Sequence, residues 1–324
     1  MIRHVLAPTS DQLEAARRVV ADHLIPTPTV DVMIRGRRVL VKLESLQATG
    51  SFKVRGALSA LDAARRDDAH GAVITSSAGN HGLGIAYAAT LLGVPATVVV
   101  PANASAAKVG KLRRYEIELI QYGSSYDEAQ AHALALADER SIHYISPFND
   151  TNVIAGQATV FDEMLDQAPE IEHVVVPVGG GGLVSGVLLS REAHGRSDVV
   201  VTGVQPAVSA AMYHVLRGIA MADVVHHATI ADGLAGGGDE GAITNELIAR
   251  YHTPLVLVPE AAIRAAVAEA TLTSGLVLEG SAAAAYAAVA DDLVDDASSR
   301  IGFLATGRNI ARELLIELLA ESTL

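Results

Sequence analysis

Four consecutive glycines form the most distinctive chemical segment of this sequence: Gly179, Gly180, Gly181 and Gly182. They follow an apolar run at residues 173–177 and precede an expected helix that starts at Leu183. Glycine lets the backbone approach an anion closely with its N–H groups turned inward, and a helix N-terminus adds about half a positive charge. The run therefore predicts a phosphate site built from backbone alone. A flexible strand–helix turn is the alternative.

A dinucleotide site is the obvious rival for such a glycine run. It needs an acidic residue roughly 20 residues further on, at the end of the next strand. The next expected strand ends Thr202-Gly203-Val204-Gln205, with no acid. A monophosphate therefore fits the sequence better than a dinucleotide.

Lys53 could supply a nucleophilic amine. It follows Ser51 and Phe52 and stands at the start of an expected helix over residues 53–66. The positive end of a helix and partial burial both lower the pKa of a lysine, which favours the neutral amine that forms an imine. Taken alone, a lysine at a helix start is usually a surface residue, so this prediction depends on its neighbours.

Two further polar segments follow expected strands. In the first, Ser76, Ser77, Asn80 and His81 surround a glycine turn, where hydroxyls and free N–H groups can hold a carboxylate and Asn80 can offer its amide to a phenolic oxygen. In the second, the hydroxyl of Thr306 can face the same cleft. Each segment could instead cap a helix, because Ser, Thr and Asn are the usual N-cap residues.

The elements that must position these segments alternate between apolar strands and amphipathic helices. Many expected strands are continuous Val/Ile runs, which are typical of parallel sheets covered on both faces. We expect strands at residues 39–43, 72–75, 96–100, 117–121, 173–177, 199–204, 255–258 and 301–305. We expect helices at residues 53–66, 81–92, 104–115, 126–140, 183–194, 261–274, 281–290 and 309–319.

This alternation predicts an α/β fold with open, mostly parallel sheets and helices on both faces. Ligands of such folds bind beyond the carboxyl ends of the strands. The segments at 76–84, 179–182 and 306–309 fall at such ends, and a fourth, 49–53, lies just before a helix. We expect the chemistry where these four segments meet.

Composition narrows the class of protein. The chain has 324 residues, half of them hydrophobic, which is enough to build a large core. The net charge of −13 argues against nucleic-acid and anionic membrane partners, and no apolar run of roughly 18 residues predicts a membrane span. The absence of cysteine excludes disulfides, thiolate metal sites and cysteine nucleophiles. With no apolar signal core at the N-terminus, we expect a cytoplasmic protein.

Taken together and in this order, the segments resemble the β-family, or fold type II, of pyridoxal-phosphate (PLP) enzymes, and most closely the threonine/serine dehydratase and serine racemase group. The resemblance spans nearly the whole chain. Further marks are Thr27-Pro28-Thr29, Glu44-Ser45-Leu46-Gln47, Pro147-Phe148-Asn149-Asp150, Ile230 to Ala235, and Glu279-Gly280-Ser281-Ala282.

The resemblance implies a role for each candidate residue. Lys53 holds the cofactor as a Schiff base and moves the α-proton, with Phe52 packed near the ring. Gly179, Gly180, Gly181, Gly182 and Leu183 hold the phosphate, Asn80 bonds the ring hydroxyl, and Thr306 bonds the pyridine nitrogen. Ser76, Ser77, Asn80 and His81 flank the substrate carboxylate. The fold it implies is the two-domain, tryptophan synthase β-like fold, with residues 1–50 and 151–324 as the large cofactor-binding domain and 51–150 as the small domain.

The implied reaction removes water from a small β-hydroxy amino acid such as serine or threonine, giving a 2-oxo acid and ammonia. A hydroxyl rather than a carboxylate at the pyridine nitrogen favours prompt loss of the β-hydroxyl over transamination. Hydroxyaspartate or phenylserine as substrate, or β-replacement, stay open. A phosphate-ligand binding protein without PLP and an NAD-dependent dehydrogenase are the rival classes. The family usually pairs as homodimers, so we expect one here.

Departures from the family pattern refine these expectations. Ala78 stands where serine racemases of this group place a second acid/base serine, so racemisation lacks a proton donor. The chain has Gln205-Pro206, Ala210 and Ala211 where many members bind a divalent cation, so we expect no metal site. Arg308 replaces a usual glycine and reaches either an acidic substrate tail or a surface carboxylate. The chain lacks the regulatory domain of the biosynthetic threonine dehydratases, so we expect no feedback control through it.

Overall fold

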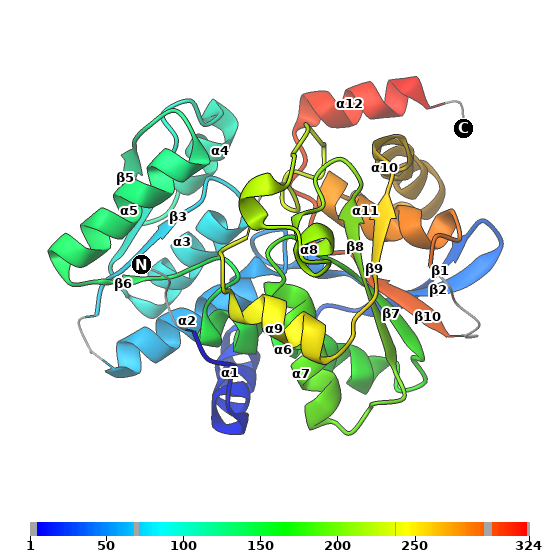
Figure 1. Ribbon diagram of the computed structural model, residues 1–324, viewed down its shortest axis with the longest axis horizontal. Helices are drawn as coiled ribbons and strands as arrows, with labels where there is room; N and C mark the ends of the chain where they lie inside the picture. The colour runs from blue at the N-terminus through cyan, green and yellow to red at the C-terminus, as the bar shows by residue number, and fades with distance from the viewer. Residues whose placement is uncertain (1–4, 68–70, 237, 295–299, 323–324) are drawn as a thin grey trace.

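Two β-sheets organise the chain in the computed structural model, which describes residues 5–67, 71–236, 238–294 and 300–322 (Figure 1). The larger sheet has the strand order β1-β2-β10-β7-β8-β9, and the smaller one β5-β4-β3-β6. Among the described strands, only β1 and β2 pair antiparallel. The strands are β1 Thr29–Ile34, β2 Arg37–Lys42, β3 Val73–Ser76, β4 Ala96–Val100, β5 Glu118–Gln121, β6 His143–Tyr144, β7 His173–Pro177, β8 Val200–Pro206, β9 Leu255–Val258 and β10 Ile301–Leu304.

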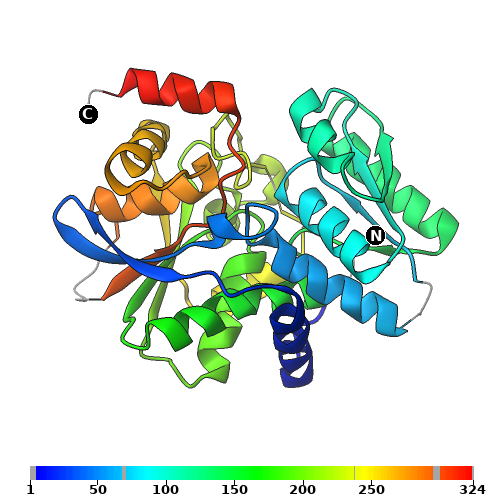
Figure 2. The ribbon, with the colours of Figure 1, turned by 180° about the vertical axis from the view of Figure 1, so that it is seen from behind.

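Helices cover both faces of each sheet, as the front and back views show (Figures 1 and 2). The α-helices are α1 Ser10–His23, α2 Lys53–Asp67, α3 Asn80–Leu92, α4 Ala106–Leu112, α5 Tyr126–Arg140, α6 Thr151–Gln167, α7 Gly182–Ala193, α8 Ala211–Val215, α9 Ile243–Arg250, α10 Glu260–Ser274, α11 Gly280–Ala290 and α12 Arg312–Glu321. Two short 3₁₀ helices are η1 Glu44–Leu46 and η2 Met221–Asp223. The predicted α/β fold class is confirmed.

Successive side chains of a buried strand enter different cores. In β7, Val175 packs with residues of α10 and α11, whereas Val174 and Val176 pack with residues of α6 and α7. The small sheet shows the same division, because Ile74 packs with α5 and Val73 packs with α2 and α3. A strand covered on both faces cannot alternate apolar and polar residues, which explains the continuous Val/Ile runs.

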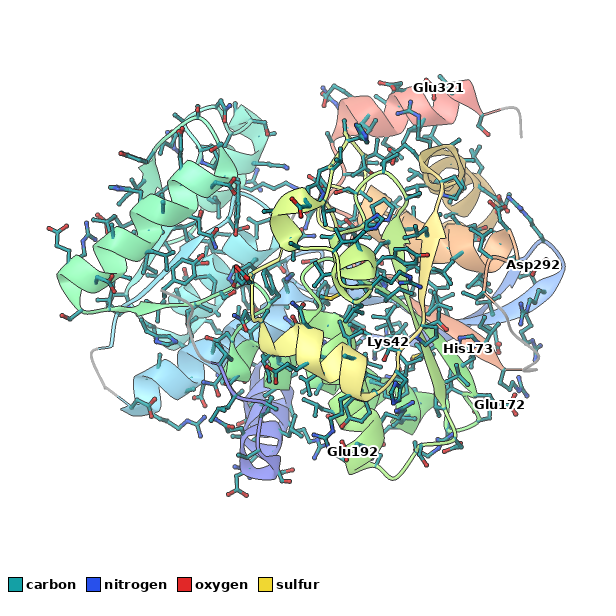
Figure 3. All side chains as sticks on the ribbon, viewed as in Figure 1. Lys42, Glu172, His173, Glu192, Asp292 and Glu321 are labelled. Atoms are coloured by element: carbon teal, nitrogen blue, oxygen red, sulfur yellow. The ribbon has the colours of Figure 1, made fainter. Side chains whose placement is uncertain are left out.

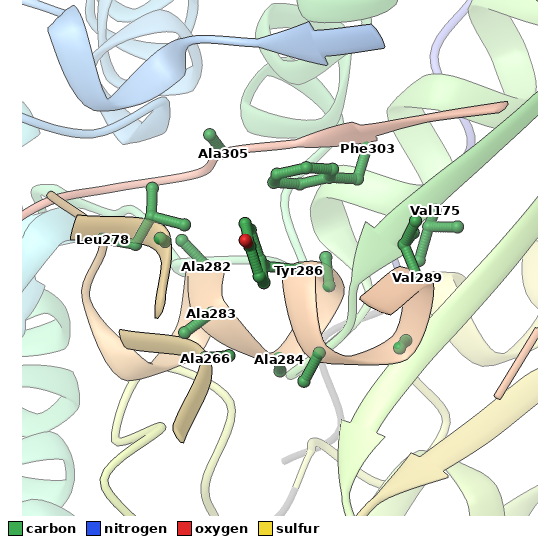
Figure 4. Packing of buried hydrophobic residues seen from close by; sticks show 14 of the residues in the cluster. Val175, Ala266, Leu278, Ala282, Ala283, Ala284, Tyr286, Val289, Phe303 and Ala305 are labelled. Atoms are coloured by element: carbon green, nitrogen blue, oxygen red, sulfur yellow. The ribbon is translucent and has the colours of Figure 1, made fainter. Parts of the chain in front are cut away.

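The alanine-rich segment forms helix α11, as predicted. Its small side chains are buried, and they let the helix lie close against the large sheet and α10 (Figure 4). Tyr286 fills the space that the alanines leave, and it packs edge to face on Phe303 of β10 at a centroid distance of 6.0 Å. Edge-to-face aromatic pairs add stability beyond the area that they bury.

A buried network of charged groups fixes helix α2. Arg55 is fully buried and forms paired hydrogen bonds to both carboxylate oxygens of Glu44, at 2.8 and 2.9 Å, and to both of Glu163, at 2.7 Å each. Lys42, labelled in the interior in Figure 3, donates to Glu163 at 2.7 Å and to the carbonyl oxygen of Thr27 at 2.6 Å. Two cations and two carboxylates balance in this network, in which Glu163 is partly exposed and the other three side chains are buried. Because Arg55 stands two residues after Lys53, the network sets the start of α2.

Several predicted elements differ from the structure. Strands 96–100, 173–177 and 255–258 and helix 126–140 have the predicted ends. The predicted helix 104–115 is too long at both ends, because Ser105 caps α4 and the helix stops at Leu112. The predicted helix 309–319 starts too early, because the Asn309 N–H bonds the Glu279 carboxylate and α12 begins only at Arg312. The elements α1, α6, α8, α9, β1 and β6 were not predicted from the sequence.

The strands of the small sheet come from residues 73–144, and those of the large sheet come from residues 29–42 and 173–304. Helix α1 packs against both α2 and α6. The predicted division into residues 51–150 and the remainder stays a prediction. Within the described residues, no helix combines the length and apolar character that crossing a membrane requires.

Candidate active site

The four polar segments meet where the two sheets approach each other. Ser51 forms an isolated antiparallel bridge with Gly307, and the Phe52 N–H donates to the Thr306 carbonyl oxygen at 3.1 Å. The side chain of Asn309 donates to the Asn80 side-chain oxygen at 2.7 Å. These contacts join segment 49–53 to the end of β10, and the end of β10 to the start of α3.

The segment between β6 and α6 brings in the glycine run. The Lys53 ammonium donates to the Pro147 carbonyl oxygen at 2.7 Å, and the next residue, Phe148, lies against Gly180 and Gly182. Lys53 therefore lies close to the glycine turn, because its amine contacts Pro147 and the next residue along the chain contacts the glycines. The four segments therefore lie together in the structure, and the roles of their residues stay predictions.

The amine of Lys53 is poised to lose its proton. Lys53 is half-buried, and the protein atoms around its amine remove water that would otherwise stabilise the charge. This desolvation lowers the pKa of Lys53 to about 8, although the nearby carboxylate of Glu279 acts in the opposite direction. A lysine with this pKa supplies neutral amine near neutral pH, as imine formation requires.

The glycine turn is shaped for close approach of a ligand to the backbone. Gly181 has φ +87°, in the left-handed region that favours glycine, and α7 begins at the next residue. A side chain at Gly180 would overlap the ring of Phe148, and one at Gly182 would lie 2.9 Å from the Phe148 Cα atom. Thr244 donates to the Gly180 carbonyl oxygen at 2.8 Å. The first N–H groups of a helix have no intrahelical acceptor, so those at the start of α7 can bind an anion.

Leu183 belongs to the apolar cluster between α6, α7 and the large sheet. Its side chain is 5% exposed, so it anchors the first turn of α7 in the core. Its backbone N–H is one of the groups at the helix start that lack an intrahelical acceptor. Leu183 can therefore contribute to the phosphate site through its backbone while its side chain fixes the helix.

The serines before α3 are not helix caps, because the N-cap is Gly79, which makes no side-chain cap hydrogen bond. The hydroxyl of Ser76 is buried and has no hydrogen-bond partner among the described residues. The hydroxyl of Ser77 accepts the Gly79 N–H at 3.2 Å. His81 is also buried, and burial lowers its pKa to about 3, so the ring is neutral at physiological pH.

Thr306 is 2% exposed, and its hydroxyl has no hydrogen-bond partner in the part of the chain that the structure describes. It is not an N-cap, because α12 begins only at Arg312. A buried hydroxyl without a partner costs free energy, which a ligand that accepts or donates a hydrogen bond would recover. Phe52 lies alongside, with its ring centroid 5.3 Å from the Lys53 amine.

Glu279 and Asn309 belong to the site, although no role was predicted for them from the sequence. The Glu279 carboxylate accepts the Asn80 side-chain N–H at 2.7 Å and the Asn309 backbone N–H at 2.9 Å. Burial raises the pKa of Glu279 to about 7, and the charge of Asp232 adds to this effect. Glu279 stood in one of the motifs that carry the resemblance, but an acid directly before a helix is ordinarily read as a helix N-terminal charge.

The region where many relatives of this group were expected to bind a cation holds neutral groups. The Gln205 side-chain oxygen accepts the Tyr213 N–H at 2.8 Å. Among the described residues, no three His, Asp or Glu side chains are grouped so that they could hold a metal ion. Arg308 is exposed and lines an open cavity of about 200 Å³ together with Lys111 and Arg114, and its predicted partner stays a prediction.

Comparison with known proteins places this geometry in a family. The family model described as "Pyridoxal-phosphate dependent enzyme" matches residues 20–307. An L-threonine ammonia-lyase of Thermotoga maritima is 37% identical over 277 residues, which are 86% of this chain and 68% of that protein. A serine racemase of Oryza sativa is 31% identical and covers 97% of this chain and 94% of its own length.

Solved structures agree. Maize serine racemase superposes with a TM-score of 0.86 at 27% identity and covers 98% of both chains. A threonine deaminase from T.th. has a TM-score of 0.82 at 32% identity and covers 94% of this chain and 99% of its own. The predicted resemblance and cofactor are confirmed.

The residues present fit the cofactor. The glycine turn offers backbone N–H groups to a phosphate, the Lys53 amine is desolvated, and the Thr306 hydroxyl is buried without a partner among the described residues. A phosphate, an aldehyde and a ring nitrogen are the three groups that such a set would receive. The match over most of its length and the fit of its site together show that this chain belongs to the family of pyridoxal-phosphate-dependent enzymes.

Proposed function

We propose that this enzyme eliminates water from a small β-hydroxy amino acid, serine or threonine, and releases a 2-oxo acid and ammonia. The proposal depends mainly on the position of the Lys53 amine. The amine is desolvated and bonds Pro147, whose neighbour Phe148 packs on the glycine turn. The names of the L-threonine ammonia-lyase and threonine deaminase relatives support this reaction. Family membership argues against both rival classes, a PLP-free phosphate-binding protein and an NAD-dependent dehydrogenase.

Lys53 would hold the aldehyde carbon of the cofactor, and its neutral amine, once released, would take the α-proton of the substrate. When bound, pyridoxal phosphate supplies the electron sink that makes this proton acidic. The low pKa of Lys53 serves this role, because a general base acts best when its pKa lies near the working pH. The Pro147 carbonyl oxygen holds the amine at the site while it is protonated.

The remaining candidate residues bind and orient. Backbone N–H groups of Gly179, Gly180, Gly181, Gly182 and Leu183 hold the phosphate, and Thr306 offers its hydroxyl to the pyridine nitrogen. Asn80 donates an N–H to the ring oxygen. A hydroxyl would not keep the pyridine nitrogen protonated as a carboxylate would, so the bound cofactor would supply a weaker electron sink, which favours elimination over transamination.

Ser76, Ser77, Asn80 and His81 form the side of the site that receives the substrate carboxylate. The unpartnered Ser76 hydroxyl supports this assignment, since a carboxylate would satisfy it. The neutral His81 ring has one N–H, which its Nε2 atom donates to the Ile145 carbonyl oxygen at 3.3 Å, so His81 lines this side of the site without donating to the carboxylate. Helix α3 begins at Asn80, so its N-terminus adds a favourable field for an anion.

Elimination rather than racemisation follows from Ala78, which lies partly buried against the small-sheet core. A methyl group cannot deliver a proton to the second face of a carbanion. We predict that Ala78→Ser introduces measurable conversion of L-serine to D-serine. The assay is chiral chromatography of the amino acid recovered after incubation, and D-isomer at the level of the unaltered enzyme would contradict the reasoning.

An oxo-acid assay tests the proposed reaction. Serine, threonine, 3-hydroxyaspartate and phenylserine are each incubated with the enzyme, and 2-oxo acid and ammonia are measured in equal amounts. Lys53→Ala should abolish turnover and retain the fold by circular dichroism. Lys108→Ala, which removes an exposed lysine instead, should still take up the cofactor covalently. Turnover of only 3-hydroxyaspartate or phenylserine would replace the proposed substrates, and ammonia release by Lys53→Ala would remove the proposed base.

We also propose a homodimer, a small domain of residues 51–150 that closes on the substrate, and no nucleic-acid partner. The net charge of −13 supports the last point. Light scattering during size-exclusion chromatography tests the dimer, and a monomeric mass at micromolar concentration would exclude it. Small-angle scattering with and without substrate analogue tests the closure.

A further inference from the structure

A chain of side-chain hydrogen bonds runs from the surface to the cofactor site. The Lys111 ammonium on α4 donates to the Asn309 side-chain oxygen at 3.0 Å. The Asn309 side-chain nitrogen donates to the Asn80 side-chain oxygen at 2.7 Å, and the Asn80 nitrogen donates to Glu279 at 2.7 Å. These four residues lie on or beside four different elements, α4, β10, α3 and α11.

The two ends of this chain fix its direction. An ammonium group only donates hydrogen bonds, and at the other end the two Glu279 oxygens accept N–H groups from Asn80 and Asn309. The carboxamides of Asn309 and Asn80 therefore turn their oxygens toward Lys111 and their nitrogens toward Glu279. A second contact reinforces this orientation, because the Asn309 side-chain nitrogen also donates to the Thr49 carbonyl oxygen at 2.8 Å.

The orientation matters at Asn80, because its amide nitrogen carries two hydrogens. Glu279 takes one, and the other stays available to the ring oxygen of the cofactor. If the Asn80 amide turned over, its oxygen would face that ring oxygen, and two acceptors would repel each other. An isolated asparagine can adopt either orientation, so something else in the structure must select one.

We propose that Glu279, Asn309 and Lys111 are positioning residues that hold the Asn80 carboxamide in the orientation that donates to the cofactor ring. This inference rests on the proposed function, in which Asn80 contacts the ring. None of the three is a catalytic residue, since each acts through Asn80. Lys111, on the far side of Asn309 from Asn80, contributes to the orientation by donating to the Asn309 side-chain oxygen, in addition to the contact with the Thr49 carbonyl oxygen.

The environment of Glu279 supports a selective role. Its side chain is buried, and Gly307 leaves room for it, because a Cβ atom there would lie 2.7 Å from the carboxyl carbon. A buried carboxylate is costly to maintain, and a neutral residue would serve simple packing better. One Glu279 oxygen accepts the Asn80 side-chain N–H, and the other accepts the Asn309 backbone N–H. These are the two residues whose side-chain amides must be oriented.

A double-mutant cycle tests the proposal, with the PLP dissociation constant of the cofactor-free protein and the visible spectrum of bound PLP as readouts. Asn80→Ala should weaken PLP binding roughly tenfold and shift the spectrum. Asn309→Ala should shift the spectrum in the same direction with a smaller loss of affinity. In the Asn80→Ala background, Asn309→Ala should have no further effect on either readout, because its influence passes through the missing amide.

Variants of Lys111, at the surface end of this series of hydrogen bonds, test the same proposal. They keep the test valid even if Asn309→Ala folds poorly. Lys111→Met should reproduce the spectral shift, whereas Lys111→Arg, which still only donates, should restore the original spectrum. Arg113→Met is the matched control, since it removes a neighbouring exposed cation that bonds Gln121 and takes no part in the hydrogen bonds from Lys111 to Glu279. It should leave both readouts unchanged.

Three results would overturn the proposal. The first is a spectrum that does not change in Asn309→Ala and Lys111→Met. The second is additive losses of affinity in the double mutant, which indicate a general structural role. The third is an equal shift in Lys111→Arg and Lys111→Met. If Asn80→Ala itself binds PLP normally with an unchanged spectrum, the proposed contact of Asn80 with the ring is wrong. If only the Asn309 and Lys111 variants lack an effect, that contact stands and only the positioning role is wrong.

Discussion

The cofactor-free protein should form an imine with PLP at neutral pH, and the rate should follow the ionisation of Lys53. The perturbation is pH, varied from 6 to 10 in roughly half-unit steps. Desolvation lowers the pKa of Lys53 from 10.5 to about 8. A shift of this size destabilises the protonated amine by at most about 3 kcal/mol, since the side chain keeps some contact with water.

The magnitude of the rate effect follows from the neutral fraction of the amine. At pH 7.5 about a quarter of the Lys53 amines are neutral, compared with about one in a thousand for an ordinary lysine. The rate should rise about tenfold from pH 7 to pH 9 and then level off. The same shift affects stability. Between pH 8 and 10.5 the unfolded chain keeps the Lys53 proton that the folded protein has lost, so the free energy of unfolding rises with pH in this range.

The assay follows the appearance of the visible band after apoprotein and PLP are mixed in a stopped-flow instrument. A small lysine analogue measured in parallel corrects for the ionisation of PLP itself. Borohydride reduction and peptide mapping then locate the label. Glu279→Gln should move the midpoint to lower pH, because the Glu279 charge raises the pKa of Lys53. A rate that climbs steadily to pH 10.5, or a label on another lysine, would refute the reasoning.

The other predictions concern the phosphate turn, the ring nitrogen and the buried charges. Gly180→Ala should weaken PLP binding at least roughly tenfold by equilibrium dialysis, because the new methyl overlaps Phe148, whereas Gly110→Ala, with open space around it, should not. Thr306→Val should weaken PLP binding by about 1 kcal/mol while leaving the melting temperature of the apoprotein equal or higher, since it removes an unpartnered buried hydroxyl; a lower apoprotein melting temperature would contradict this. Glu44→Gln should lower the free energy of unfolding in urea by about 3–5 kcal/mol, and a loss under about 1 kcal/mol would show that Glu44 is not needed to balance the network.

The central strands could be predicted from sequence because burial on two faces leaves a local signature. Strands 96–100 and 173–177 each contain three consecutive valines, and every residue in them is buried. The turns after the strands were equally visible, since glycine at 179–182 and small polar residues at 76–80 are rare inside regular elements. Such local signals sufficed to predict which segments form the site.

Other elements were missed for different physical reasons. Helix α6 lies between α2 and α7 and is buried over most of its surface, so it has no clear polar face for periodicity to reveal. Helix α1 does carry a signal, a capping box in which Thr9 and Gln12 bond each other's backbone, and this could have identified it. The β1–β2 hairpin was also detectable, because Arg35 and Gly36 form a two-residue turn with positive φ at both positions.

Sequence reasoning reaches its limit where one residue's role depends on another far along the chain. Glu44 belongs to a motif that indicated the family, yet its carboxylate lies on Arg55 rather than at the candidate site. Glu279 belongs to another such motif, yet its carboxylate contacts Asn80, 199 positions away. Both are acidic residues next to short helices, and their local sequences do not separate a structural carboxylate from one that orients the site. Only the partner distinguishes them, and the partner is set by how the two sheets come together.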